Sequence, residues 1–208
     1  MIKKNRIVDK RTLETYLMTA ELDASLYEDR SQKLGEQNLM SETKTTITVY
    51  KDGKTKIATM QASILVVPTK HLPTEALEST TQNPIPEKQL GINWLCEQAY
   101  ILSQRCSQKE SDNVDVVLPL TSHLYIESLT VDNAFRRHGI GTAMLDFAVE
   151  LYMPTSVVSF VGNNNAEGNA MAKALRFAPQ NLTAKDVPWE PKTLYRKQIK
   201  LTVQGGLR

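Results

Sequence analysis

The chain has 208 residues, of which 41% are hydrophobic and 23% are charged, and its formal net charge is +2. This composition is typical of a globular protein of about one domain, and it argues against a disordered chain. So small a charge imbalance argues against a dominant nucleic-acid or membrane-surface role, and the absence of any apolar run of about eighteen residues argues against a transmembrane helix.

The first half of the chain is predicted to hold a helix, a hairpin and a helical excursion. Apolar residues at three- and four-residue spacing favour an amphipathic helix over residues 10–30. The β-rich runs TTITVY and TKIATMQASILVV flank Asp52-Gly53, a strong hairpin signal, and predict two strands within residues 45–67. Proline-rich residues 68–86 are typical of a loop, and the apolar spacing after them predicts a helix over 86–107.

The second half is predicted to alternate strands and helices. The runs VDVVL and HLYIESLTV predict two strands, which are followed by the turn DNAFRRHG and a helix over 140–152. A strand over 156–161, a helix over 166–176 and a closing strand in LYRKQIKLTV complete the order. We therefore expect a single mixed α/β domain over residues 1–208, with the excursion at about 68–113.

The segment LYIESLTVDNAFRRHGIGTAMLDFAVEL is the part of the chain that indicates chemistry. A strand ends at Val131, a turn carries Arg136 and Arg137, and Gly139 and Gly141 open a helix. The first amides of a helix lack partners and carry the positive end of its dipole, and glycines let a phosphate approach the backbone closely. This arrangement predicts a site for a pyrophosphate.

Two other nucleotide-binding motifs fail on particular residues. A P-loop needs lysine after its second glycine, where this chain has Thr142. A dinucleotide-binding fingerprint needs a third glycine, where Met144 stands, and an acidic residue about 20 positions on, where the chain reads Ser159 to Gly162.

The run Arg136-Arg137-His138-Gly139-Ile140-Gly141 resembles the Arg/Gln-x-x-Gly-x-Gly/Ala signature of the GNAT superfamily of acyl-CoA-dependent N-acetyltransferases, and YIESLTV resembles the strand before it. The resemblance implies a mixed, mostly antiparallel central sheet that is splayed at its centre and flanked by helices on both faces, with acetyl-CoA in the gap. It implies that the backbone at Leu129, Thr130 and Val131 pairs with pantetheine, and that Arg136 and the amides of Arg137, His138, Gly139, Ile140, Gly141 and Thr142 hold the pyrophosphate.

Glu127 is the candidate catalytic base. It lies within an apolar strand, where strict alternation places it on one face with Tyr125, Leu129 and Val131. Attack on a thioester requires a neutral amine, so a group must accept its proton. In family members with this strand pattern the matching glutamate lies near the acceptor amine, which supports the assignment of Glu127.

The last helix departs from the family pattern Asn-x-x-Ala-x-x-x-Tyr-x-x-x-Gly-Phe. Aligned on Phe177, the pattern places Asn165 at its start, where the resemblance implies a contact with the coenzyme A arm. The usual tyrosine, which protonates the departing thiolate, is replaced by Ala172, and the glycine by Arg176. Tyr152, Tyr195 or water are alternatives for that acid.

We expect no metal site, because His71 and His123 lack neighbouring ligands at metal-binding spacing. His138 is interpreted as a phosphate contact or an exposed spacer. Cys96 and Cys106 lie too far apart on one predicted helix to pair, so reduced thiols and a cytoplasmic location are expected.

The sequence thus predicts an N-acetyltransferase that uses acetyl-CoA as a co-substrate and no metal. Its acceptor is a small-molecule amine, a protein amine or an aminoacyl-tRNA, with no other nucleic-acid partner and no membrane, and a homodimer is left open. The alternative is a non-catalytic acyl-CoA-binding module that acts as a sensor or scaffold.

Overall fold

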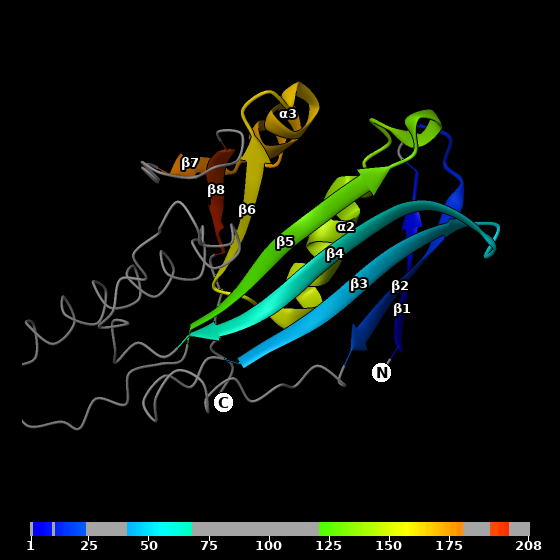
Figure 1. The fold of residues 1–208 in the computed structure, drawn as a ribbon. Helices are drawn as coiled ribbons and strands as arrows, with labels where there is room; N and C mark the ends of the chain where they lie inside the picture. The colour runs from blue at the N-terminus through cyan, green and yellow to red at the C-terminus, as the bar shows by residue number, and fades with distance from the viewer. Residues whose placement is uncertain (1, 10, 24–40, 68–120, 181–191, 200–208) are drawn as a thin grey trace, which may run out of the picture.

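The computed structural model describes residues 2–9, 11–23, 41–67, 121–180 and 192–199. In this part of the chain, eight strands form one sheet and two α-helices pack against it (Figure 1). The strands are β1 (Ile2–Val8), β2 (Thr15–Asp23), β3 (Ser41–Lys51), β4 (Thr55–Val67), β5 (Thr121–Val131), β6 (Ser156–Gly162), β7 (Ala178–Gln180) and β8 (Lys192–Gln198). The helices are α2 (Ile140–Tyr152) and α3 (Ala166–Ala174), with a 3₁₀ turn, η3, at Asn133–Phe135.

The sheet is mixed and mostly antiparallel, as predicted. Its strand order is β1-β2-β3-β4-β5-β6-β8-β7, and β5 with β6 forms the parallel pair in an otherwise antiparallel set. Helix α2 connects the two parallel strands, which is the crossover that such a pair requires.

The sheet is also splayed at its centre, as the resemblance implied. Strand β5 pairs with β6 only where His123–Tyr125 meets Ser156–Val158. Beyond those residues the two strands diverge, while β6 pairs with β8 along its whole length (Figure 1). The divergence leaves one edge of β5 without a strand partner among the described residues from Ile126 onward.

The predicted hairpin is confirmed as β3 and β4. Asp52 and Gly53 have φ angles of 53° and 67°, and the Lys54 N–H donates to the Lys51 carbonyl at 3.1 Å. Two successive left-handed residues match the twist of the flanking strands, which explains why an Asp-Gly pair closes this turn.

The helix predicted over residues 10–30 is wrong in its described part. Residues 15–23 form β2, which lies between β1 and β3, and residues 24–30 lie outside the described part. Tyr16, Met18 and Ala20 are 2%, 1% and 1% exposed and alternate along the strand. The apolar residues of this stretch fit both a helical spacing and the two-residue alternation of a strand. Pairing with the two neighbouring strands favours the strand.

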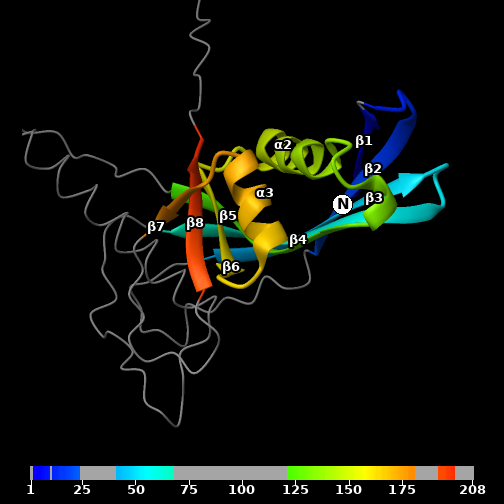
Figure 2. The same ribbon diagram turned by 90° about the horizontal axis from the view of Figure 1, so that it is seen from above.

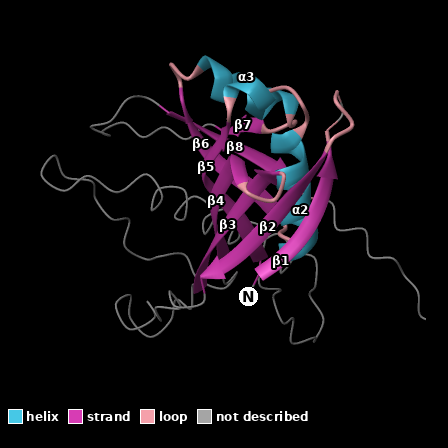
Figure 3. Cartoon of the chain, turned by 90° about the vertical axis from the view of Figure 1, so that its right-hand side faces the viewer, coloured by secondary structure: helices cyan, strands magenta, loops and turns pink. Residues whose placement is uncertain are grey.

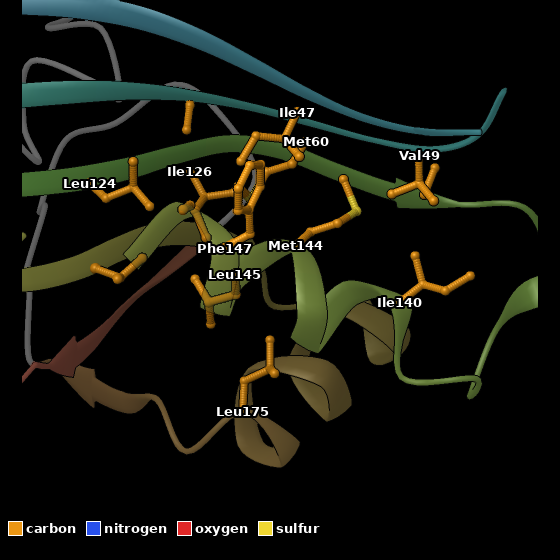
Figure 4. Close-up of a cluster of buried hydrophobic side chains, with 14 of the residues drawn as sticks. Ile47, Val49, Met60, Leu124, Ile126, Ile140, Met144, Leu145, Phe147 and Leu175 are labelled. Carbon is orange, nitrogen blue, oxygen red and sulfur yellow. The ribbon is translucent and has the colours of Figure 1, made fainter. Parts of the chain in front are cut away.

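Helix α2 covers one face of the sheet and forms the core with it (Figures 2 and 3). It begins and ends at the residues predicted. Met144 and Phe147 pack against Met60 and Ile126 of the strands (Figure 4), and the Tyr152 hydroxyl lies 2.6 Å from the Thr45 hydroxyl of β3.

Helix α3 packs beside the first turn of α2 and belongs to the same core cluster. A side chain at Gly141 would lie 3.4 Å from the Met171 methyl group of α3, so the two helices are in close contact. The described helices thus lie on one side of the sheet (Figure 2). The predicted helix at 86–107, the strand at 114–118 and the loop at 68–86 lie outside the described residues.

Candidate functional site

A cavity of about 440 Å³ lies where β5 and β6 diverge. One wall is the second half of β5, the opposite wall is β6 with β8, and α3 closes a third side. Four residues predicted from the sequence line it together, namely Glu127, Leu129, Thr130 and Asn165. Further lining residues include Ser159, Phe160, Gly168, Met171, Ala172 and Tyr195.

A β-bulge places Glu127 in this cavity. Ile126 pairs with Ala62 and Ser128 pairs with Gln61, so Glu127 is the extra residue of β5. Because a bulge shifts the alternation by one, Leu129 and Val131 face the core together with Ile126. The prediction that Glu127 shares their face is therefore wrong, although it remains on the face of Tyr125 and Ser63.

The Glu127 carboxylate is exposed, and a hydrogen bond from Ser63 fixes its position. The hydroxyl of Ser63, a residue with 0% exposure, donates to Glu127 Oε1 at 2.7 Å. The bulge and this hydrogen bond together fix a carboxylate at the lip of the cavity, where a proton acceptor can meet an incoming group.

The start of α2 has the features of an anion site. Arg137 and Gly139 have φ angles of 63° and 84°, and Gly139 is the N-cap residue without a side-chain cap. Among the described residues, none accepts a hydrogen bond from the amides of residues 137–142, whereas the Ala143 N–H donates to the Gly139 carbonyl at 3.0 Å. A left-handed cap followed by unpaired amides concentrates partial positive charge at this point.

The Arg136 side chain bridges the two sides of the splay. Its Nη1 lies 2.7 Å from both carboxylate oxygens of Glu167 in the first turn of α3, and its Nε donates to the Val131 carbonyl at 3.1 Å. The sequence prediction placed this arginine on a pyrophosphate. In this structure it joins the end of β5 to α3, and its role toward a phosphate stays a prediction.

His138 is neither an exposed spacer nor isolated, because it is paired with Asp9. Its Nδ1 lies 2.6 Å from Asp9 Oδ2, and Asp9 is 1% exposed. Tyr16 donates to the same oxygen at 2.9 Å, and the amides of Arg11 and Thr12 donate to Oδ1 at 2.7 and 3.1 Å. Nothing in the local sequence signalled Asp9, which lies 129 residues from its partner.

Burial and hydrogen bonding act in opposite directions on Asp9. Burial raises the pKa of its carboxyl, but the hydrogen bonds from His138, the two amides and Tyr16 outweigh burial and hold that pKa well below its ordinary value. Burial, with the neighbouring Asp9 and Glu14 carboxylates, raises the pKa of Tyr16 to about 12. Asp9 is therefore ionised, and the Tyr16 hydroxyl beside it is neutral.

At α3, Asn165 is the N-cap residue, and its Oδ1 accepts from the Gly168 N–H at 2.8 Å. This leaves the Asn165 side chain at the cavity wall, where a contact with a bound molecule stays a prediction. Asn169, one turn on, accepts from the Tyr195 hydroxyl at 2.9 Å. Of the alternatives for a general acid, Tyr195 lines the cavity, whereas the Tyr152 hydroxyl lies on Thr45.

Within the described ranges, no cluster of three His, Cys, Asp or Glu residues is arranged to hold a metal ion. His123 lies against Ser156, with its Nδ1 2.8 Å from the serine hydroxyl, and His71 lies outside those ranges. Of the same residues, none forms a helix long and apolar enough to cross a membrane.

Comparison with known proteins adds a family match. The model of the acetyltransferase (GNAT) family matches residues 110–177. No curated protein matches the chain.

The chain is also similar to solved structures. Arabidopsis thaliana NAA60 in complex with acetyl-CoA is 16% identical, with 74% of this chain and 76% of that chain covered and a TM-score of 0.45. The GNAT domain of S. lividans PAT is 10% identical, with 94% and 97% covered and a TM-score of 0.46. The ribosomal-protein-S18-alanine N-acetyltransferase from Escherichia coli is 11% identical, with 100% of both chains covered and a TM-score of 0.39.

The matched segment includes β5, the glycine loop, α2, β6 and α3, which hold the row of amides and most of the cavity wall, whereas β8 lies outside it. Residues 110–177 are therefore similar to the acetyltransferase (GNAT) family.

Proposed function

We propose that this protein is an N-acetyltransferase that moves the acetyl group of acetyl-CoA to a primary amine by direct attack. The observation that carries the proposal is the row of amides at residues 137–142, which lack acceptors among the described residues and adjoin the cavity in the splay. The two are neighbours because Leu129 and Met171, which line the cavity, also contact the position of Gly141.

The proposed binding mode assigns one part of coenzyme A to each feature. The amides of Arg137 to Thr142 hold the diphosphate, since a helix N-terminus favours an anion and glycines permit close approach. The unpaired edge of β5 at Leu129 to Val131 offers backbone groups to the amides of pantetheine, as a further strand would. Asn165 lies at the wall that such an arm follows into the cavity.

The proposed chemistry needs a proton acceptor, and Glu127 is the residue that we assign. Acetyl-CoA supplies the thioester carbonyl that the amine attacks. Glu127 takes the proton that the amine nitrogen loses as the new C–N bond forms, and Ser63 keeps the carboxylate oriented. Direct transfer of this kind requires no protein nucleophile.

The acceptor amine stays open between a small molecule, a protein amino group and an aminoacyl-tRNA. A binding module without turnover is the second candidate function, and it is favoured by Ala172, which stands where the family pattern has tyrosine. Acetyl-CoA binding followed by thiol release with a panel of amines separates the two functions, because the module binds acetyl-CoA and releases no thiol with any amine.

The decisive variant is Glu127→Gln, which keeps the shape of the side chain and removes its basicity. We expect thiol release to fall by about 10²- to 10⁴-fold, the usual contribution of general base catalysis, while CoA affinity measured by calorimetry is unchanged. Glu150→Gln on the exposed face of α2 is the matched control and should retain turnover. Wild-type turnover in Glu127→Gln would show that Glu127 is structural.

A further inference from the structure

Tyr195 has a defined position in the cavity that Glu127 also lines. It lies on β8, in the wall opposite β5, and is 6% exposed. Its hydroxyl donates to Asn169 Oδ1 at 2.9 Å, which fixes the phenol against α3. A buried tyrosine whose ring lines a cavity and whose hydroxyl has one known partner is suited to donate a proton into that cavity.

Asn169 is itself held in one orientation. Its Nδ2 donates to the carbonyls of Asn165 at 2.8 Å, Gly162 at 2.9 Å and Asn163 at 3.4 Å. Rotating the amide by half a turn would set its oxygen against these carbonyl oxygens, so Oδ1 must face Tyr195. Asn169 therefore determines where the Tyr195 hydroxyl lies.

The position of that hydroxyl relates to Ala172. Asn169 and Ala172 are three residues apart on α3, so they lie on the same face of the helix. Ala172 is 7% exposed and lines the cavity together with Tyr195. The Tyr195 phenol thus extends from β8 to the face of α3 that carries Ala172, the position at which the family pattern has a tyrosine.

We propose that Tyr195 is the general acid of the transfer and that Asn169 is the residue that positions it; this inference rests on the proposed function. As the amine nitrogen bonds to the acetyl carbon, the carbon–sulfur bond breaks and its electron pair leaves with sulfur. The Tyr195 hydroxyl gives its proton to that sulfur, and the phenolate recovers a proton from water. Glu127 releases the proton that it took from the amine to the hydroxide left in the solvent, so the products are the amide and a neutral thiol.

One hydroxyl can serve both partners because its hydrogen rotates about the C–O bond. In the structure the hydroxyl donates to the Asn169 oxygen, which is a neutral acceptor. A thiolate is a charged acceptor, and hydrogen bonds to charged acceptors are about twice as strong as neutral ones. The hydrogen therefore turns to sulfur when a thiolate occupies the cavity.

The test needs no acceptor amine. It measures the ionisation of the thiol of protein-bound CoA, by monitoring the ultraviolet absorbance of the thiolate across a pH series. A hydrogen bond from Tyr195 favours the thiolate, so Tyr195→Phe should raise the midpoint of ionisation by about one to two pH units. Tyr152→Phe removes the same atom at a site away from the cavity, where the hydroxyl bonds Thr45, and should leave the midpoint unchanged.

The outcomes separate the two proposals. If CoA does not bind the wild type, the proposed function and this inference both fall. If CoA binds and Tyr195→Phe leaves the midpoint unchanged, or if Tyr152→Phe moves it equally, only the assignment of Tyr195 falls.

A second variant moves the phenol rather than deleting it. Tyr195→Ala combined with Ala172→Tyr transfers the ring from β8 to the position of the family tyrosine at nearly constant volume. We expect Tyr195→Ala alone to raise the thiol midpoint and the double variant to return it toward the wild-type value. A midpoint in the double variant equal to that of Tyr195→Ala would contradict the proposal.

Discussion

His123 is a titratable side chain buried in the short parallel pairing of β5 and β6. It is 4% exposed, and its Nδ1 lies 2.8 Å from the hydroxyl of Ser156, the residue with which it pairs. Burial lowers the pKa of His123 to about 4, and the positive charge of Arg196 acts in the same direction. His123 is therefore neutral in the folded protein at the point where the splay begins.

We expect this histidine to make the protein acid-sensitive. In the unfolded chain the imidazole takes up a proton below its ordinary pKa of 6.5, whereas the folded protein resists protonation until about pH 4. The stability that the neutral form contributes is thus complete above pH 6.5 and is lost as the pH falls toward 4. The gap between the two pKa values corresponds to about 3 kcal/mol of unfolding free energy.

Urea unfolding of the wild type and of His123→Gln at about pH 7 and about pH 4 measures this contribution directly. Glutamine can still bond Ser156 but does not titrate, so the variant should lose less stability than the wild type over that range. Equal losses in both proteins would show that other groups cause the acid sensitivity.

The residues of the site divide by how far along the chain their partners lie. Gly139, Gly141 and Glu127 were predicted because the features that mark them, a strand, a turn and a helix, are adjacent in sequence. The partners Asp9–His138 and Arg136–Glu167 are 129 and 31 residues apart. No local pattern predicts such pairs, because their meeting depends on the strand order.

The secondary structure elements that were predicted correctly are those with the strongest local sequence signals. The Asp52-Gly53 turn and the breaker-free helix at 140–152 were predicted correctly because their own residues determine their conformation. Strands β1 and β7 were missed. β1 is exposed along most of its length and β7 has three residues, so neither shows the alternation of a half-buried strand.

Two glycines allow a matched test of how α3 is held at the cavity wall. A Cβ at Gly168 would lie 2.8 Å from Asn165 Nδ2 and 2.9 Å from Val161 Cγ1, so Gly168→Ala must displace the N-cap residue. We expect a loss of about 1–2 kcal/mol, comparable with the loss of a helix cap. Because Asn165 lines the cavity, weaker CoA binding should accompany that loss.

Gly141→Ala is the control for that change. Its Cβ would meet the flexible end of Met171 at 3.4 Å, which is ordinary contact, and alanine favours a helix over glycine by up to about 1 kcal/mol. Thermal unfolding should therefore show lower stability for Gly168→Ala and unchanged or higher stability for Gly141→Ala. The reverse order would mean that the N-terminus of α3 adapts freely.

At the scale of the whole molecule, the N-terminal strands are joined to the glycine loop. Asp9 follows β1 and binds His138, which precedes α2. Phe135 of η3 packs edge-on against Tyr16 with ring centroids 6.0 Å apart, and the Lys51 ammonium lies 5.6 Å from the Phe135 centroid. Three separate stretches of the first 51 residues thus support a loop that lies more than 80 residues further along the chain.

The contact between Asp9 and His138 leads to a prediction about coenzyme A binding as well as about the fold. Both Asp9 oxygens accept hydrogen bonds, from His138 and Tyr16 on one side and from the Arg11 and Thr12 amides on the other. An asparagine would turn its NH₂ group toward two of these donors in either orientation, so Asp9→Asn should weaken the contacts that hold His138. The left-handed conformation of Arg137, the residue before His138, would then lose the contact that supports it. The amides of residues 137–142 would no longer be held in a fixed arrangement.

We therefore expect Asp9→Asn to lower CoA affinity in calorimetry by about tenfold, the value of one hydrogen-bond-sized contribution, and to lower the melting temperature as well. Glu21→Gln, an exposed carboxylate on the same pair of strands, should change neither quantity. A variant that melts lower but binds CoA as the wild type does would show that the N-terminal strands stabilise the fold without shaping the loop. Weaker binding, by contrast, would mean that the amides at the start of α2 depend for their geometry on a residue at the far end of the chain.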